Sequence, residues 1–229
     1  MAFDKEAFYQ FMIDNRVVEF REQPIVLKSK RESHLYINWR TAMEDVFLTD
    51  RLTDMVLEYL DWQGIRVDTL YGVPEAATKL ALLAQFKLAK RCPDYRAGSH
   101  VLAMGRGKPK DEHGNPKDRY LLGQPKGLTL VIEDVTTTAA SAISAAKLVE
   151  QGGVSVTGIL SLFNRMNLDS DRRSAEDACR EAALQPFQWI GAADELLPRA
   201  YATLQPGHEI ADRIEEEYRQ FGVKPILLR

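Results

Sequence analysis

The sequence predicts an α/β fold in which a doubly wound, mainly parallel sheet follows a small N-terminal hood made of a helix and a hairpin. Two observations carry this prediction. From about residue 46 onward, short and partly β-branched apolar runs alternate with segments of helical period, the pattern of parallel strands joined by helices. Before that point, one amphipathic segment and two extended segments follow one another. We therefore expect a single domain over residues 1–229, with the hood at about 1–45 and the α/β core at about 46–229.

The hood and the first core helix follow from local patterns. Apolar residues spaced along one helical face predict a helix over residues 3–15. Extended segments at 26–29 and 35–38 are separated by charged residues that suit a hairpin turn. The next helix is expected over residues 49–60, with Thr49 or Asp50 as its N-cap, because short polar side chains accept hydrogen bonds from first-turn amides.

The core begins with a strand at 67–73, which Gly72 and Pro74 bring to an end before a helix at 75–90. The apolar run at 128–133 suits a strand buried on both faces, and the Ala-rich stripe at 138–150 stops at two glycines. The polar segment at 105–119 has no hydrophobic period and is expected to be a loop. The same patterns predict further strands at 100–104, 154–163 and 188–191, and helices at 174–184, 195–204 and 209–221.

Composition excludes several classes of protein. A net charge of -3 gives no support for nucleic-acid or polybasic membrane binding, and no apolar run has the length of a membrane span. The charged N-terminus lacks a signal-peptide core. Cys92 and Cys179 provide neither a disulfide framework nor a metal-ligand spacing, so we expect two inert thiols in a cytoplasmic protein.

The strand at 128–133 ends in two carboxylates, Glu133 and Asp134, and a hydroxyl-rich turn leads into the next helix. Ligands of open parallel sheets bind at the carboxyl ends of the strands, and a turn that precedes a helix N-terminus suits an anion. Carboxylates beside an anion site are favourable only when one ligand carries both an anionic group and hydrogen-bond donors. A phosphorylated sugar meets this condition, because its hydroxyls donate to the acids while the amides hold its phosphate.

This arrangement resembles the 5-phosphoribosyl-1-pyrophosphate (PRPP) motif of type I phosphoribosyltransferases, which implies that fold for the whole chain. The chain departs from the family at Ala139, where glycine is usual, and at Ala140, where a hydroxyl is usual. The resemblance implies that Glu133 and Asp134 hold the ribose hydroxyls and that Asp134 is catalytic. It implies a PRPP-binding loop made of Val135, Thr136, Thr137, Thr138, Ala139, Ala140 and Ser141.

The loop at 105–119 narrows the resemblance to orotate phosphoribosyltransferase. Arg106, Lys110 and His113 match that family's catalytic flap if one residue is inserted, and Lys108 stands beside a basic position that is Gly107 here. The resemblance implies that Arg106, Lys110 and His113 are catalytic and that Lys108 binds PRPP. It also implies a homodimer in which each flap reaches the neighbouring site.

Three further segments agree with this family. Lys28 is expected to contact PRPP, as are Tyr71, Gly72 and Val73, where Tyr71 replaces a lysine found in part of the family. The positions implied to bind the base are Tyr36, Ile37, Thr137 and Arg165. Arg165 would hold the orotate carboxylate, since a guanidinium binds a carboxylate through two hydrogen bonds.

The implied reaction transfers the 5-phosphoribosyl group from PRPP to orotate and yields orotidine 5′-phosphate and pyrophosphate, a step of pyrimidine (UMP) biosynthesis. Mg²⁺ would arrive with PRPP, with no direct protein ligand. Two alternatives stay open: a type I phosphoribosyltransferase for another nucleobase, and a non-catalytic regulator that senses PRPP or a nucleotide. No nucleic-acid or membrane partner is expected.

Overall fold

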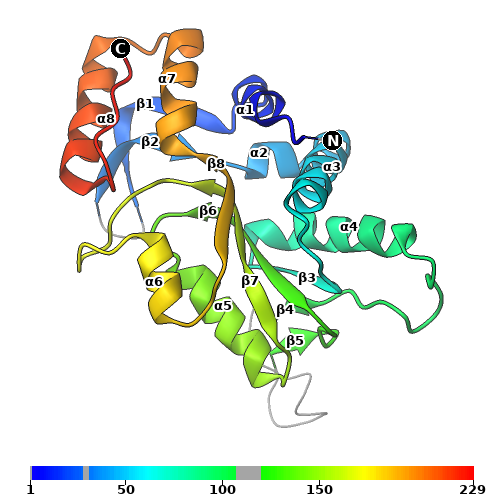
Figure 1. The fold of residues 1–229 in the computed structure, drawn as a ribbon. Helices are drawn as coiled ribbons and strands as arrows, with labels where there is room; N and C mark the ends of the chain where they lie inside the picture. Colours follow the sequence, from blue (N-terminus) through cyan, green and yellow to red (C-terminus); the bar gives the residue numbers. More distant parts are fainter. Residues whose placement is uncertain (1, 28–30, 107–119) are drawn as a thin grey trace.

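The computed structural model describes residues 2–27, 31–106 and 120–229. Its centre is a parallel sheet of four strands in the order β3-β6-β7-β8, with helices on both faces (Figure 1). The doubly wound α/β fold expected from the sequence is therefore confirmed. The strands are β3 (Thr69–Gly72), β6 (Thr129–Thr136), β7 (Val156–Asn164) and β8 (Phe187–Ala192). The helices packed around them are α3 (Val46–Gln63), α4 (Ala76–Arg91), α5 (Ala140–Gln151), α6 (Ala175–Glu181), α7 (Ala193–Leu204) and α8 (His208–Phe221).

Successive strand residues face opposite sides of the sheet, and each side carries its own apolar cluster. Leu130 and Ile132 belong to the main cluster, which α3 and α4 cover. Val131 and Ile159 belong to the second cluster, which α5 and α6 cover. Both faces are thus buried, as the continuous apolar run of β6 predicts. Among the helices that the structure describes, none is long and apolar enough to cross a membrane.

The hood consists of α1 (Lys5–Asp14) and the antiparallel pair β1 (Val18–Val26) and β2 (Glu32–Ile37). It lies against the C-terminal part of the chain, and Figure 1 shows the β1–β2 pair beside α8. Phe8 and Trp39 are fully buried in the main cluster, and the Ala192 amide donates to the Tyr9 hydroxyl at 3.2 Å. The hood is therefore packed into the same core as the sheet.

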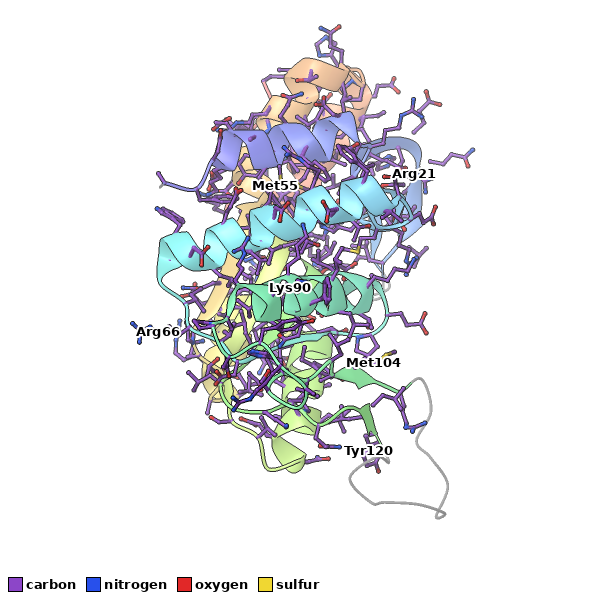
Figure 2. The ribbon with its side chains drawn as sticks, turned by 90° about the vertical axis from the view of Figure 1, so that its right-hand side faces the viewer. Arg21, Met55, Arg66, Lys90, Met104 and Tyr120 are labelled. Carbon is purple, nitrogen blue, oxygen red and sulfur yellow. The ribbon has the colours of Figure 1, made fainter. Side chains whose placement is uncertain are left out.

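Some expected boundaries were wrong. Helix α3 begins three residues early because Asp45 is its N-cap and accepts from the Leu48 amide at 2.8 Å. The strand expected at 100–104 is only β4 (Met104–Gly105), which pairs antiparallel with β5 (Leu121–Leu122). Figure 2 labels Met104 and, just before β5, Tyr120. A short helix α2 (Arg40–Met43) and strand β5 were not predicted, since both are too short to show a period.

Candidate functional site

A cavity of about 830 Å³ opens at the carboxyl ends of β6 and β7. Most of its wall residues come from three parts of the chain: the hood with the residues just after β2, the β6–α5 turn, and the segment that follows β7. The side of the cavity near α4 is formed by Pro74, Glu75 and Ala76, and Phe221 of α8 lines it as well. This is the edge at which parallel sheets bind ligands, so the expected position of the site agrees with the geometry.

The two carboxylates at the end of β6 both line this cavity. Glu133 is buried and lies in register with Ser161 of β7, whereas Asp134 is half-buried. Consecutive strand residues point in opposite directions, so the two acids approach the cavity from different sides of the strand end. They supply the acceptors that a polyhydroxylated ligand needs.

The turn after the acids forms the start of α5, as expected. Val135, Thr137, Thr138, Ala140 and Ser141 line the cavity, and within the described residues α5 has no side-chain cap. Its first amides therefore remain available to an anion. Thr136 and Ala139 line the cavity as well. The buried hydroxyl of Thr136 donates to Ser161 Oγ at 2.8 Å, so this side chain also stabilises the sheet.

Ala139 adopts φ 60° and ψ 4°, the left-handed conformation immediately before α5. The family's usual glycine reaches this conformation without steric cost, whereas alanine costs about 1–2 kcal/mol. The departure from the family's glycine therefore does not prevent the left-handed conformation at this position. The chain keeps the turn, and the backbone of Ala139 is strained as a result.

The residues expected to hold pyrophosphate, 71–73, do not line the cavity, whereas the next three residues, 74–76, do. Tyr71 is fully buried in the second cluster, burial raises the pKa of its hydroxyl, and that hydroxyl has no partner among the described residues. The Val73 amide donates to the Ile132 carbonyl at 2.8 Å. A Cβ on Gly72 would lie 2.2 Å from the Ala77 carbonyl oxygen, so glycine there allows α4 to start close to β3. Residues 74–76 line the cavity, and the Pro74–Glu75 peptide between the first two is cis.

The opposite wall contains Tyr36, Ile37 and Arg165, all three expected near the base. Arg165 is 2% exposed, and protein groups hold its guanidinium. Nε donates to Asn167 Oδ1 at 3.2 Å, and Nη1 donates to the Leu35 carbonyl at 3.0 Å. Nη2 donates to Ser33 Oγ at 3.0 Å and to Glu217 Oε1 at 3.1 Å. Four of the five guanidinium hydrogens thus have acceptors on the hood, α8 and the segment after β7.

Three arginines that were not singled out from the sequence also line the cavity: Arg31, Arg40 and Arg172. The Arg31 guanidinium lies 4.7 Å from the centre of the Phe221 ring, and Arg172 donates to the Gln220 carbonyl at 2.7 Å. Burial lowers the pKa of Arg31, and the neighbouring Glu217 opposes this shift. Arg172 follows the end of β7, where the strand-end rule could have found it.

Several expected site residues cannot be placed. Lys28, Lys108, Lys110 and His113 lie outside the described residues. Arg106 is half-buried directly after β4, and its amide donates to the Tyr120 carbonyl at 2.9 Å. The described chain therefore reaches both ends of the expected flap, which occupies the interval between β4 and β5.

No family model matches the chain. It is 33% identical over 197 residues to the orotate phosphoribosyltransferase of Rhodopseudomonas palustris strain BisB5, an alignment that covers 82% of this chain and 94% of the relative. It is 27% identical over 224 residues to the enzyme of that name from Chromobacterium violaceum, covering 96% and 97% of the two chains.

Solved structures show the same fold. Orotate phosphoribosyltransferase from Francisella tularensis superposes with a TM-score of 0.67 at 17% identity, covering 94% of this chain and 99% of that one. Leishmania donovani UMP synthase superposes with a TM-score of 0.71 at 17% identity, covering 93% of this chain and 42% of that one. The motifs, the cavity and these relatives agree, and this chain belongs to the orotate phosphoribosyltransferase family.

Proposed function

We propose that this protein transfers the 5-phosphoribosyl group of PRPP to a ring nitrogen of orotate and releases pyrophosphate. The observation that carries the proposal is the β6–α5 turn, which presents two carboxylates and the uncapped start of a helix to one cavity. That combination suits a sugar phosphate, because amides bind the phosphate while the acids accept from the hydroxyls. Membership of the family supports the same ligand.

The ligand would lie with its 5′-phosphate on the amides of Thr137 to Ser141 and its ribose hydroxyls on Glu133 and Asp134. The pyrophosphate would extend toward residues 74–76, and the base toward Tyr36 and Ile37. All of these groups line the cavity. The transition state resembles an oxocarbenium ion, with positive charge on the ribose and negative charge on the departing pyrophosphate. Catalysis would therefore consist mainly of electrostatic stabilisation of these two charges.

The base wall favours a base that carries a negative charge. Arg165 Nη2 donates to Glu217 Oε1 at 3.1 Å, and Arg31 lies near enough to interact with the same carboxylate. The orotate carboxylate would bring a negative charge beside these two arginines, which uracil, adenine and hypoxanthine do not carry. We propose that the carboxylate accepts from the fifth guanidinium hydrogen of Arg165, on Nη1, with Arg31 close by.

Mg²⁺ is proposed to enter with PRPP. Mg²⁺ usually keeps several waters and binds substrate phosphates, so PRPP can carry the ion without a direct protein ligand, and the carboxylates at the end of β6 add negative charge nearby. When bound, Mg²⁺ would neutralise charge on the departing pyrophosphate. The protein's own contribution would come from Arg106 and from Lys110 and His113 of the flap, which would cover the site and exclude water. Lys28 and Lys108 would add charge beside PRPP.

We further propose a homodimer in which each flap serves the neighbouring cavity, and a single domain over residues 1–229. The burial of hood residues such as Phe8 and Trp39 in the main cluster supports the single domain. A Lys110→Ala protein should lose most turnover whether the flap serves its own cavity or the cavity of the neighbouring subunit. Mixing it with an Arg165→Ala protein should restore part of the turnover only when flap and base wall come from different subunits.

The test is a spectrophotometric assay with PRPP, Mg²⁺ and a panel of orotate, uracil, hypoxanthine and adenine. Consumption of orotate alone supports the proposal, and turnover of another base with none of orotate refutes it. PRPP binding measured by calorimetry without turnover of any base would instead indicate a regulator. Lys110→Ala should abolish most turnover while PRPP still binds, and Lys147→Ala, an exposed lysine on α5, is the matched control.

A further inference from the structure

The segment between α4 and β4 brings together three side chains that the proposed reaction does not use. Cys92, Asp94 and His100 each direct a ligand atom into one cluster, in which all three atoms lie within 4.8 Å of one another. None of them lines the cavity. Sequence spacing gives no hint of this cluster, because the three residues do not share a helix face or a strand.

Two turns fold the segment back on itself. The Tyr95 amide donates to the Cys92 carbonyl at 3.2 Å, and the Ser99 amide donates to the Arg96 carbonyl at 3.2 Å. These turns return the chain to the end of α4, whose last turn includes Lys90, labelled in Figure 2. The Tyr95 ring stacks on the His100 imidazole, with centroids 6.4 Å apart and an angle of 25° between the planes. The Tyr95 ring thus packs beside the imidazole.

One ring nitrogen of His100 makes no hydrogen bond to the described part of the protein. Nε2 is buried and has no hydrogen-bond partner within the described residues. It lies 3.4 Å from Asp94 Oδ1, but without hydrogen-bond geometry. Two ligands of a tetrahedral Zn²⁺, bound at about 2.0–2.2 Å, are about 3.4 Å apart. An ion between these atoms would satisfy a nitrogen that is otherwise costly to bury.

Cys92 supplies the third ligand, and it is the accessible thiol of the two in the chain. Its Sγ is half-buried and donates to the Leu88 carbonyl at 3.4 Å, a weak bond that it would give up on becoming a thiolate ligand. Cys179 is fully buried in the second cluster, where burial raises its pKa to about 12. Only Cys92 is therefore suited to bind a metal.

We propose that Cys92, Asp94 and His100 form a Zn²⁺ site whose fourth position is taken by water. Thiolate and imidazole ligands favour a borderline-soft ion such as Zn²⁺ over Mg²⁺ or Ca²⁺. The thiolate and the carboxylate together balance the two positive charges of the ion. The site would join the end of α4 to the segment that leads into β4. Its role is structural, because the cluster lies outside the cavity.

The test uses the full-length protein, stripped with a chelator and titrated with zinc chloride in competition with a chromophoric chelator. We expect one Zn²⁺ per chain. Cys92→Ser and His100→Gln should each weaken binding by at least about 100-fold, since even outer-shell partners typically change affinity 10–100-fold. His208→Gln and Cys179→Ala are matched controls that should bind as the wild type does.

Two further measurements separate this site from other thiols and histidines. Cobalt substitution should give a thiolate-to-metal absorption band that Cys92→Ser abolishes, and zinc should slow alkylation of Cys92. Equal zinc affinity in the wild type and both ligand variants would overturn the proposal, as would the absence of saturable binding. Loss of binding in His113→Gln but not in His100→Gln would overturn it too, because the ion would then belong to the flap.

Discussion

The charge balance around Arg165 can be tested by removing the charge of Glu217 with an isosteric change, Glu217→Gln. Arg165 Nη2 lies 3.1 Å from Glu217 Oε1, and the two side chains are 3% and 10% exposed. Ser33 donates to Glu217 Oε2 at 2.7 Å, and a glutamine carbonyl can keep one of these acceptor roles. The variant therefore loses the charge while it retains the shape.

Removing one partner of a buried ion pair costs about 3–5 kcal/mol, because the other charge stays buried and unpaired. A glutamine at 217 keeps part of the hydrogen bonding, so we expect the free energy of unfolding to fall by about 3 kcal/mol. For a chain of this size the melting temperature should fall by about 6–12 °C. Orotate KM should also change more than PRPP KM, because Glu217 pairs with the arginine of the base wall.

The assay is urea unfolding followed by fluorescence, together with steady-state kinetics of the same preparations. Glu216→Gln is the matched control, since Glu216 is exposed, lies next in sequence and pairs with Arg219 on the surface of α8. Exposed pairs contribute about 0.2–1 kcal/mol, so this control should unfold almost like the wild type. If Glu217→Gln were no less stable than Glu216→Gln, the buried-pair reasoning would be refuted.

Three other substitutions test the turn and strand ends. Tyr71→Phe should leave the free energy of unfolding unchanged or raise it by about 1 kcal/mol, because the buried hydroxyl has no partner within the described residues. A lower melting temperature than that of the wild type would contradict this. Gly72→Ala should destabilise by about 1–3 kcal/mol and lower kcat/KM, since its Cβ meets the Ala77 carbonyl at 2.2 Å; unchanged melting and activity would show that α4 shifts freely. Ala139→Gly should change stability by less than about 1 kcal/mol, because relief of backbone strain is offset by lost methyl burial and a larger unfolded-state entropy; calorimetry showing more than about 2 kcal/mol either way would contradict it.

Short-range patterns were enough to predict the strand that ends in Glu133-Asp134 and the helix after it, because both depend on neighbouring residues. The same patterns placed the end of the strand too early. Backbone pairing with β7 continues as far as Thr136, opposite Asn164, and draws the Thr136 hydroxyl into the sheet. Where a strand stops depends on its neighbour, and the sequence of one strand does not contain that information.

Long-range contacts were beyond sequence reasoning. Three of the four partners of Arg165 lie 130, 132 and 52 residues away, on β2 and α8. An arginine at a strand end is equally compatible with a surface ion pair, and only the folded chain shows that it is buried. The grouping of Cys92 with His100 was missed for a related reason, since two irregular turns create it and neither turn has a hydrophobic period.

Ala139 shows why a departure from the family pattern need not abolish the phosphate site. The turn is fixed at both ends, because the Arg165 amide donates to the Thr136 carbonyl at 2.8 Å and the Ile143 amide donates to the Ala139 carbonyl at 2.9 Å. Between these bonds the chain must reverse within three residues, whichever side chain occupies position 139. The Ala139 methyl is buried against the second cluster, and burial of one methyl group recovers about 0.8 kcal/mol of the strain. Strand and helix therefore impose the cradle, and the amides at the start of α5 remain available to an anion.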